Sequence, residues 1–152
     1  MSFDIFFIAM KQRKTSAIPM QDVLQAFEGL CELERITDQR DGKKHIRWNT
    51  LPGDDKWGYV TISAFEGDEN LCRDVSIHRP TNDPVFWKTM FGLMEKFPLG
   101  LVLPTTNSDL CWILANESFR GDFQNDDDMP IVIISTPEEL CETISNDHVA
   151  DS

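Results

Sequence analysis

An almost unbroken apolar stretch near the N-terminus, from Phe3 to Met10, constrains the fold more than any other feature of the sequence. Its residues are mainly aromatic or β-branched, which favours a β-strand. Polar residues do not alternate with the apolar ones, and Asp4 is the one exception. A strand of this kind is typical of a position with both faces covered. We therefore expect it near the middle of a sheet.

Apolar residues recur at helical spacing in the segment that follows a basic loop. Pro19 suits an early helical position, where its missing N–H is not needed. The pattern predicts an amphipathic helix from about Pro19 to Glu34. The residues on its apolar face are separated by three or four positions and are Met20, Val23, Leu24, Phe27, Leu30 and Cys31.

Two further helices have clear start signals. Asp83 is a favourable N-cap, and the apolar face that follows it predicts a helix to about Phe97. A capping box at residues 136–139 predicts a short closing helix through about Ile144. We expect the end of the chain, from about 146 to 152, to be frayed.

Most of the remaining apolar segments have strand character. Alternation predicts a strand from Trp57 to Phe65, and a turn at residues 66–70 then leads to a returning strand from Leu71 to His78. The charged segment from Thr37 to Lys44 is predicted to be a loop. Further short strands are expected at residues 45–48, 101–103, 110–115 and 131–134. The pattern at 110–115 is also compatible with a helix, and the strand at 131–134 is expected to be buried.

These elements predict an α+β fold in a single globular domain, residues 1–152. The sheet is expected to be mixed but mostly antiparallel, with about six strands. Two long helices and a short C-terminal helix pack on it. A chain of this length is enough for one hydrophobic core.

Acidic residues are concentrated after the first third of the chain. The first fifty residues contain eight Lys or Arg and seven Asp or Glu, whereas the remainder contains six and nineteen. The net charge is -12, and from Leu101 onward Arg120 is the only basic residue. Nucleic-acid binding requires Lys and Arg spread over one face, so we expect no nucleic-acid partner. An acidic surface instead favours a basic protein partner.

The sequence contains no motif typical of a metal, cofactor or nucleophile site. His45, His78 and His148 are far apart, and the four cysteines form no Cys-x-x-Cys pair. Neither a glycine-rich phosphate loop nor a nucleophile elbow is present. We therefore expect no metal, no cofactor and no catalytic residue, and we expect the cysteines to be buried free thiols.

A small cofactor-free enzyme is an alternative that stays open. His78 and Arg79 follow a predicted strand and precede a predicted helix, a position where many enzymes place working residues. In that interpretation His78 is a base and Arg79 binds an anion, with Asp74 and Glu66 as neighbouring carboxylates. A His-Arg pair at the end of an ordinary strand is the simpler interpretation.

Seven carboxylates are the residues that we expect to contact Lys and Arg of a protein partner. They lie in two acidic loops and are Glu66, Asp68 and Glu69 in the first and Asp122, Asp126, Asp127 and Asp128 in the second. Aromatic side chains often supply the affinity of a protein interface. Trp57 and Tyr59 are candidate anchors, provided that their face of the strand is exposed.

The chain as a whole is a compact acidic domain that opens on Ser2-Phe3-Asp4-Ile5-Phe6-Phe7 and carries Asp-rich loops. In this it resembles small bacterial immunity proteins, which neutralise a cognate toxin. The resemblance implies a non-enzymatic inhibitor that binds a toxin domain, often a basic one, and blocks its active site or a surface near it. A secretion chaperone that holds an extended client segment is a second alternative with a similar order of helices and strands, although the strand at residues 3–10 departs from that pattern.

The sequence also bears on where the protein resides. No apolar segment approaches the roughly 18 residues of a membrane span. The N-terminus carries an acid where a signal peptide has basic residues. We expect a cytoplasmic protein with no membrane partner.

Overall fold

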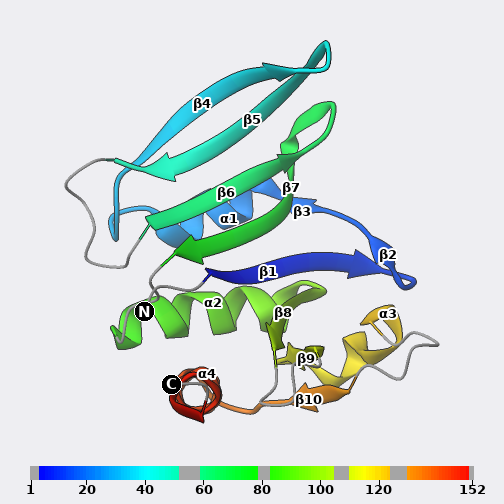
Figure 1. Ribbon diagram of the computed structural model, residues 1–152, viewed down its shortest axis with the longest axis vertical. Helices are drawn as coiled ribbons and strands as arrows, with labels where there is room; N and C mark the ends of the chain where they lie inside the picture. The colour runs from blue at the N-terminus through cyan, green and yellow to red at the C-terminus, as the bar shows by residue number, and fades with distance from the viewer. Residues whose placement is uncertain (1–3, 52–58, 79–82, 105–109, 124–129, 151–152) are drawn as a thin grey trace.

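The computed structural model describes residues 4–51, 59–78, 83–104, 110–123 and 130–150. They form an α+β fold with one large mixed sheet (Figure 1). The predicted class is confirmed. The predicted number of strands is wrong, because the sheet has ten strands within the described ranges rather than about six, and the helices differ in length from those expected.

The main path of the sheet follows the order β10-β9-β8-β1-β7-β6-β5-β4. The short strands β2 and β3 pair with β1 and β7. All neighbours are antiparallel except β9 and β10, which are parallel. The strands are β1 (Asp4–Lys11), β2 (Lys14–Thr15), β3 (Ile18–Pro19), β4 (Leu33–Arg40), β5 (Lys43–Thr50), β6 (Tyr59–Phe65), β7 (Asp68–His78), β8 (Leu99–Pro104), β9 (Leu110–Leu114) and β10 (Ile131–Ile133).

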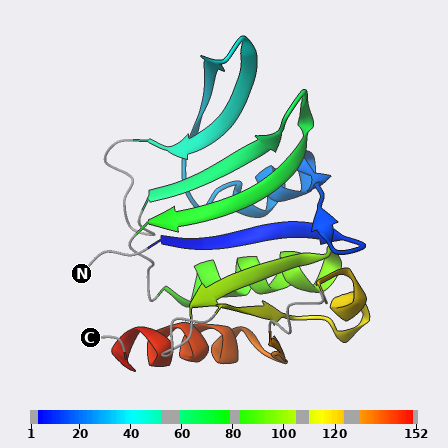
Figure 2. The same ribbon diagram turned by 45° about the vertical axis from the view of Figure 1, so that its right-hand side comes forward.

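The helices are α1 (Met20–Phe27), α2 (Pro84–Lys96), η1 (Glu117–Phe119), α3 (Arg120–Phe123) and α4 (Pro137–Ala150). Figures 1 and 2 show α1 and α2 on the same side of the sheet, with α4 next to α2. Their buried side chains share one core with the central strands. We call the opposite side of the sheet the open face. No helix in the described ranges is both long and apolar enough to cross a membrane.

β1 lies in the middle of the sheet, between β7 and β8, as predicted. Its two faces differ, however. Ile5, Phe7 and Ala9 are at most 1% exposed and belong to the core, whereas Phe6 on the open face is 44% exposed. The prediction that both faces are covered is wrong at Phe6, because α1, α2 and α4 all pack on the other side. Farther along the open face, Ile8 and Met10 are partly buried against the cluster that includes Phe123 of α3.

The two later helices begin where their capping signals predict. The Asp83 side chain accepts a hydrogen bond from the Val85 N–H at 3.0 Å, at the start of α2. The Thr136 hydroxyl accepts one from the Glu139 N–H at 3.2 Å, at the start of α4. α4 continues to Ala150 and is therefore longer than the predicted closing helix.

α1 is shorter than predicted, with eight residues that end at Phe27. Gly29 has a φ of +79°, in the left-handed region that glycine favours and that commonly ends a helix. Leu30 and Cys31 keep the helical spacing in the sequence, but they pack against the core from the connection to β4. The apolar spacing therefore extends past the real stop signal, which is the glycine.

The charged segment predicted to be a loop is part of a β-hairpin. β4 and β5 pair along their whole length, up to Arg40↔Lys43, across the two-residue turn Asp41-Gly42. Both turn residues have positive φ, 52° and 76°. Asp-Gly is a preferred sequence for the type I′ turn, which requires such values. No residue of β4 is fully buried, so its sequence lacks the alternation of apolar and polar residues that indicates a strand.

The β4–β5 hairpin joins the rest of the sheet through a short ladder. β5 pairs with β6 at three positions, from Arg47 to Asn49. Thr50 then bonds to β6 through its side chain: its hydroxyl oxygen accepts from the Val60 N–H at 2.9 Å and its O–H donates to the Val60 carbonyl at 3.2 Å. Thr50 is 4% exposed, so these hydrogen bonds are shielded from water.

The C-terminal part of the sheet agrees with the sequence in outline. β8 and β9 cover the two segments where short strands are expected and pair antiparallel, and β9 is a strand rather than a helix. β10 was predicted to be buried. It lies at one end of the sheet order instead, with Val132 42% exposed, because only β9 pairs with it in the described part of the chain.

A second apolar cluster lies on the open face, where α3 covers β8 and β9. Phe123 of α3 packs edge-to-face on Trp112 with ring centroids 4.8 Å apart. A Cβ atom built on Gly100 would lie 2.6 Å from the Phe123 ring and 2.9 Å from Leu114. A glycine at this position of β8 therefore allows the aromatic ring to approach the sheet.

We expect Gly100→Ala to destabilise the protein by about 1–3 kcal/mol, because the added methyl group overpacks a filled site. Gly92→Ala is the matched control, since Gly92 is exposed within α2 and nothing lies within 4 Å of the added atom. The control should be neutral or stabilise by up to about 1 kcal/mol. Urea unfolding measures both, and equal stability of the two variants would contradict this packing.

Candidate binding site

Three of the seven predicted partner-binding carboxylates lie together at the β6–β7 hairpin. Glu66 lies in its turn, and its carboxylate is 2.8 Å from the Lys43 ammonium. Glu69 is 2.6 Å from the Arg35 guanidinium. The Asp68 carboxylate accepts a hydrogen bond from the Asn70 N–H at 2.9 Å. The β6–β7 acids therefore lie against basic residues of the neighbouring β4–β5 hairpin.

These ion pairs change the ionisation of the groups involved. Hydrogen bonding to Lys43 lowers the pKa of Glu66, and the same contact raises the pKa of Lys43. Both charges are held at neutral pH, and they offset each other. The carboxylates of Glu66 and Glu69 are therefore not a free anionic patch, although each remains about half exposed.

Asp122 has a different environment. Its side chain accepts a hydrogen bond from the Gln12 N–H at 3.0 Å, and its carbonyl accepts one from the Arg13 N–H at 2.9 Å. Gln12 and Arg13 have φ values of 51° and 65°, which non-glycine residues adopt at a cost. Asp122 thus holds the turn between β1 and β2. Asp126, Asp127 and Asp128 lie outside the described residues.

The structure separates the residues of the enzyme alternative. His78 is exposed at the end of β7, and Glu66 lies beyond the opposite end of that strand. Asp74 is four residues from His78, which corresponds to roughly 13 Å along a strand. The Asp74 carboxylate instead accepts a hydrogen bond from Arg73 at 2.8 Å. Arg79 lies outside the described residues.

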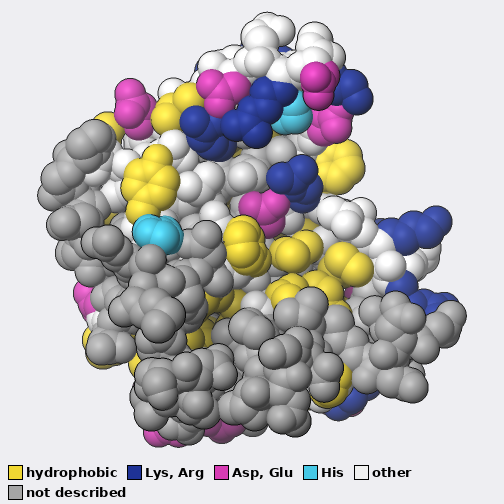
Figure 3. Space-filling model, viewed as in Figure 1, with side chains coloured by type: hydrophobic (Ala, Val, Ile, Leu, Met, Phe, Trp, Pro, Cys, Tyr) yellow, Lys and Arg dark blue, Asp and Glu magenta, His cyan; other side chains and the backbone are white. Residues whose placement is uncertain are grey.

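The open face of the sheet carries exposed aromatic side chains. Tyr59 is 49% exposed and Phe6 is 44% exposed. Figure 3 shows hydrophobic side chains gathered in the middle of this face, with charged side chains beyond them. Tyr59 was a candidate anchor only if its face of the strand is exposed, and this condition is met. Trp57 lies outside the described residues, and the exposure of Phe6 was missed because β1 was expected to be covered on both faces.

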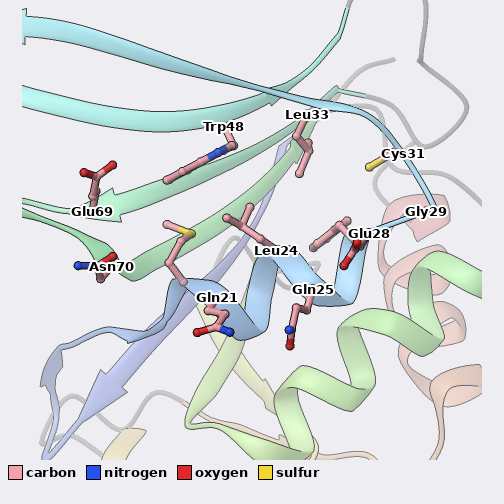
Figure 4. Close-up of a pocket in the computed structure, with 12 residues that line it drawn as sticks. Gln21, Leu24, Gln25, Glu28, Gly29, Cys31, Leu33, Trp48, Glu69 and Asn70 are labelled. Carbon is pink, nitrogen blue, oxygen red and sulfur yellow. The ribbon is translucent and has the colours of Figure 1, made fainter.

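A groove of about 570 Å³ lies between α1 and the β4–β5 hairpin. We call it the Trp48 groove. Trp48 reaches into it from β5, Leu24 from α1 and Leu33 from β4 (Figure 4). All three side chains are only partly buried. The groove therefore has an apolar floor that is accessible to a second molecule.

The rim of the Trp48 groove is polar and acidic. Glu28 lies at the end of α1 on one side, and Glu69 and Asn70 of β7 lie on another (Figure 4). None of the described residues that line the groove is Lys or Arg. An apolar floor with a carboxylate rim suits an apolar side chain flanked by basic ones.

The groove exists because the helix layer is narrower than the sheet. Trp48 pairs with Ile62, whose side chain is buried in the core, so both point to the side on which α1 packs. α1 ends at Phe27 and does not extend over β4 and β5 (Figure 1). Trp48 was not singled out in the sequence, although a Trp on a short, mostly polar strand is an available signal.

A second hollow continues from the Trp48 groove along the β6–β7 hairpin. Its volume is about 380 Å³, and it shares Glu69 and Asn70 with the groove. Ile46 of β5 and Phe65 of β6 supply apolar surface there. Phe65 is 36% exposed. The two hollows together follow the side of the sheet beyond the end of α1.

The described residues offer no metal site and no activated nucleophile. No group of three or more His, Cys, Asp or Glu among them is placed to hold a metal ion. None of the four cysteines forms a disulfide, as predicted. Cys72 and Cys111 are buried, but the prediction of burial is wrong for Cys31 and Cys141, which are partly exposed. Burial raises the pKa of the Cys72 thiol to about 12, so this group stays protonated.

Comparison with known proteins identifies no relative of the chain. No family model matches it. No curated protein and no solved structure matches it either.

On the open face, Asp38 of β4 joins the two strands of the β4–β5 hairpin. Its carboxylate accepts a hydrogen bond from the Arg47 guanidinium and lies 3.8 Å from Arg40. The bond from Arg47 holds the pKa of Asp38 below its ordinary value of 3.8. A carboxyl group with a lowered pKa stabilises the fold when ionised, and this contribution is lost as the pH falls through the lowered value.

We expect Asp38→Asn to reduce the Tm slightly at pH 7, and the difference from wild type to disappear as the pH falls below 3.8. Thermal unfolding followed by circular dichroism at several pH values measures this. Glu142→Gln is the control, because Glu142 is exposed on α4. A difference that stayed constant down to the lowest pH would show that the Asp38 charge is not responsible.

Proposed function

We propose that this chain is a non-enzymatic protein-binding domain that docks a basic polypeptide at the Trp48 groove. The observation that carries the proposal is the partly exposed Trp48 ring in an apolar groove with a carboxylate rim. Tryptophan is enriched among the residues that dominate binding energy, since it buries a large area at low entropic cost. In the absence of a partner, a folded chain gains free energy by covering such a ring with its own residues, because this removes apolar surface from water.

The charge of the chain supports the choice of a basic partner. The net charge is -12, and Glu28 and Glu69 lie at the rim of the groove. Charge complementarity mainly accelerates encounter and excludes wrong partners, whereas buried aromatic contacts set the dissociation rate. The ion pairs of Glu66 and Glu69 with Lys43 and Arg35 reduce the local field, so Trp48 contributes more to affinity than these carboxylates do.

The specific form of this function that we propose is immunity against a toxin. The resemblance to immunity proteins implies that the basic polypeptide is a toxin domain and that binding blocks its activity. Asp122 and the acidic segment at residues 126–128 remain part of this proposal as further contacts with Lys and Arg. The separation of His78 from Asp74 and Glu66 supports a binding function over the enzyme alternative.

A pair of aromatic truncations tests the site. The bound protein is captured from an extract of cells that encode this chain, purified and titrated against variants. Trp48→Ala should weaken binding by about 30-fold or more, as expected for a central aromatic anchor. Tyr59→Ala, on the open face, is the matched control and should change affinity little. The reverse pattern would place the interface on the open face and overturn the groove as the site.

A charge-matched pair of triple variants tests the electrostatic part. Replacing Glu66, Asp68 and Glu69 jointly by Gln, Asn and Gln should slow association with the same partner, most strongly at low salt. Replacing three exposed acids of α4 by Gln changes the net charge equally, and these are Glu138, Glu139 and Glu142. Association rates measured at low and high salt compare the two. Equal slowing by both triples would mean that only the overall charge matters.

A further inference from the structure

β4 is the last strand of the sheet, and no strand pairs with its outer edge in the described part of the chain. It is eight residues long, from Leu33 to Arg40. An edge of this length presents a row of backbone N–H and C=O groups that an extended chain can pair with. β10, at the other end of the sheet order, has three residues. β4 therefore offers the longer template.

We propose that the partner enters the Trp48 groove as an extended segment that pairs with β4 and adds one strand to the sheet. This inference rests on the proposed function and specifies how the partner binds. The occupant is a segment with apolar residues at alternate positions and Lys or Arg between them. Its backbone bonds to β4, its apolar side chains enter the groove, and its basic side chains lie on the open face, where Glu34 is exposed.

The hydrogen-bond register of the hairpin identifies the backbone groups that are available. In an antiparallel pair, hydrogen-bonded and non-hydrogen-bonded residue pairs alternate. The Leu51 N–H donates to the Glu32 carbonyl at 3.1 Å, which makes that position a hydrogen-bonded one. The two-residue turn requires that Arg40 and Lys43 also form a hydrogen-bonded pair. The residues of β4 whose N–H and C=O groups point away from β5 are then Leu33, Arg35, Thr37 and Gln39.

The side chains of these same residues lie on the groove side of the sheet. Leu33 lines the groove, and Arg35 bonds to Glu69 of its rim. In a paired strand, the side chains directly opposite point to the same face. Alternate side chains of an added strand would therefore extend the apolar floor formed by Leu24, Leu33 and Trp48.

The other side chains of an added strand would lie on the open face. There β4 presents Glu34, Ile36, Asp38 and Arg40. Asp38 is paired with Arg47 and Arg40, whereas Glu34 is exposed. Lysine or arginine opposite Glu34 gains a cross-strand ion pair. Two copies of this chain each carry a net charge of -12 and repel each other, which disfavours a second copy as the occupant.

Peptides of defined sequence test the chemistry of the occupant. The probe is a blocked, fluorescently labelled heptapeptide, Lys-Val-Lys-Leu-Lys-Val-Lys, and its control has Glu in place of each Lys. Anisotropy should show binding of the basic peptide at least tenfold tighter than that of the acidic one at low salt. Trp48→Ala should reduce the affinity for the basic peptide by a similar factor. Equal binding of both peptides would overturn the proposed occupant.

Backbone methylation tests the strand geometry. The amide groups of a strand point alternately to its two edges, and only one edge of the peptide would face β4. Two versions of the basic peptide carry N-methyl groups on either the Lys or the Val and Leu residues. One version should lose at least tenfold in affinity and the other should bind like the parent. Equal affinity of the two methylated versions would overturn strand addition.

The protein side of the pairing has its own matched variants. Thr37→Pro removes an N–H that points away from β5, and proline is tolerated at such edge positions. Thr37→Pro should reduce the affinity for the basic peptide at least tenfold, whereas Thr37→Val should leave it unchanged. Amide exchange by NMR needs no variant: peptide binding should protect the amides of Leu33, Arg35 and Thr37 and leave that of Ile36 unchanged. Unchanged exchange at all of these amides would overturn the inference.

These outcomes separate the inference from the proposed function. If Trp48→Ala abolishes partner binding while Thr37→Pro and the edge amides show no effect, the groove stands and strand addition is wrong. If no peptide binds, the inference fails, and the captured partner still tests the groove through Trp48. If sedimentation shows that Thr37→Pro converts a dimer to a monomer, the edge belongs to a second copy and the inference is overturned.

Discussion

Burial of one face of the central strands against α1 and α2 is the constraint on which the rest of the structure depends. Ile5, Phe7 and Ala9 of β1 are removed from water by this packing, and the helix layer is only wide enough for the middle of the sheet. α1 ends at Phe27, so β4 and β5 extend beyond the layer. The partly exposed Trp48 and the groove around it follow directly from that difference in width.

The β4–β5 hairpin is stabilised in a different way from the core. Its turn has the backbone conformation that Asp-Gly favours, and its strands are joined by Asp38 with Arg47 on one face and braced by Arg35 with Glu69 on the other. Exposed ion pairs contribute little to stability because water and salt screen them, and a hairpin without a covering layer is marginally stable. A segment of this kind opens locally at lower cost than the core.

The sequence predicts the parts of this fold whose signals are local and apolar. The central position of β1 and the start of α2 at its Asp83 cap are examples. The prediction is wrong before the Asp41-Gly42 turn, where a paired strand consists mainly of charged and polar residues. It is also wrong after Gly29, where the apolar spacing continues beyond the end of the helix. The Trp48 groove depends on which strands the helices leave uncovered, which is a tertiary property, and the Trp on a mostly polar strand is its one local signal in the sequence.

The short connection between the β4–β5 hairpin and β6 has a mechanical consequence. Three ladder positions and the Thr50 hydroxyl attach the hairpin to the body of the sheet, whereas the hairpin itself is paired over its full length. The ion pairs Lys43–Glu66 and Arg35–Glu69 add exposed side-chain links to the β6–β7 hairpin. Because Trp48 is on the hairpin and Leu24 is on α1, the few bonds that fix the hairpin to the sheet also set the distance across the groove between these two side chains.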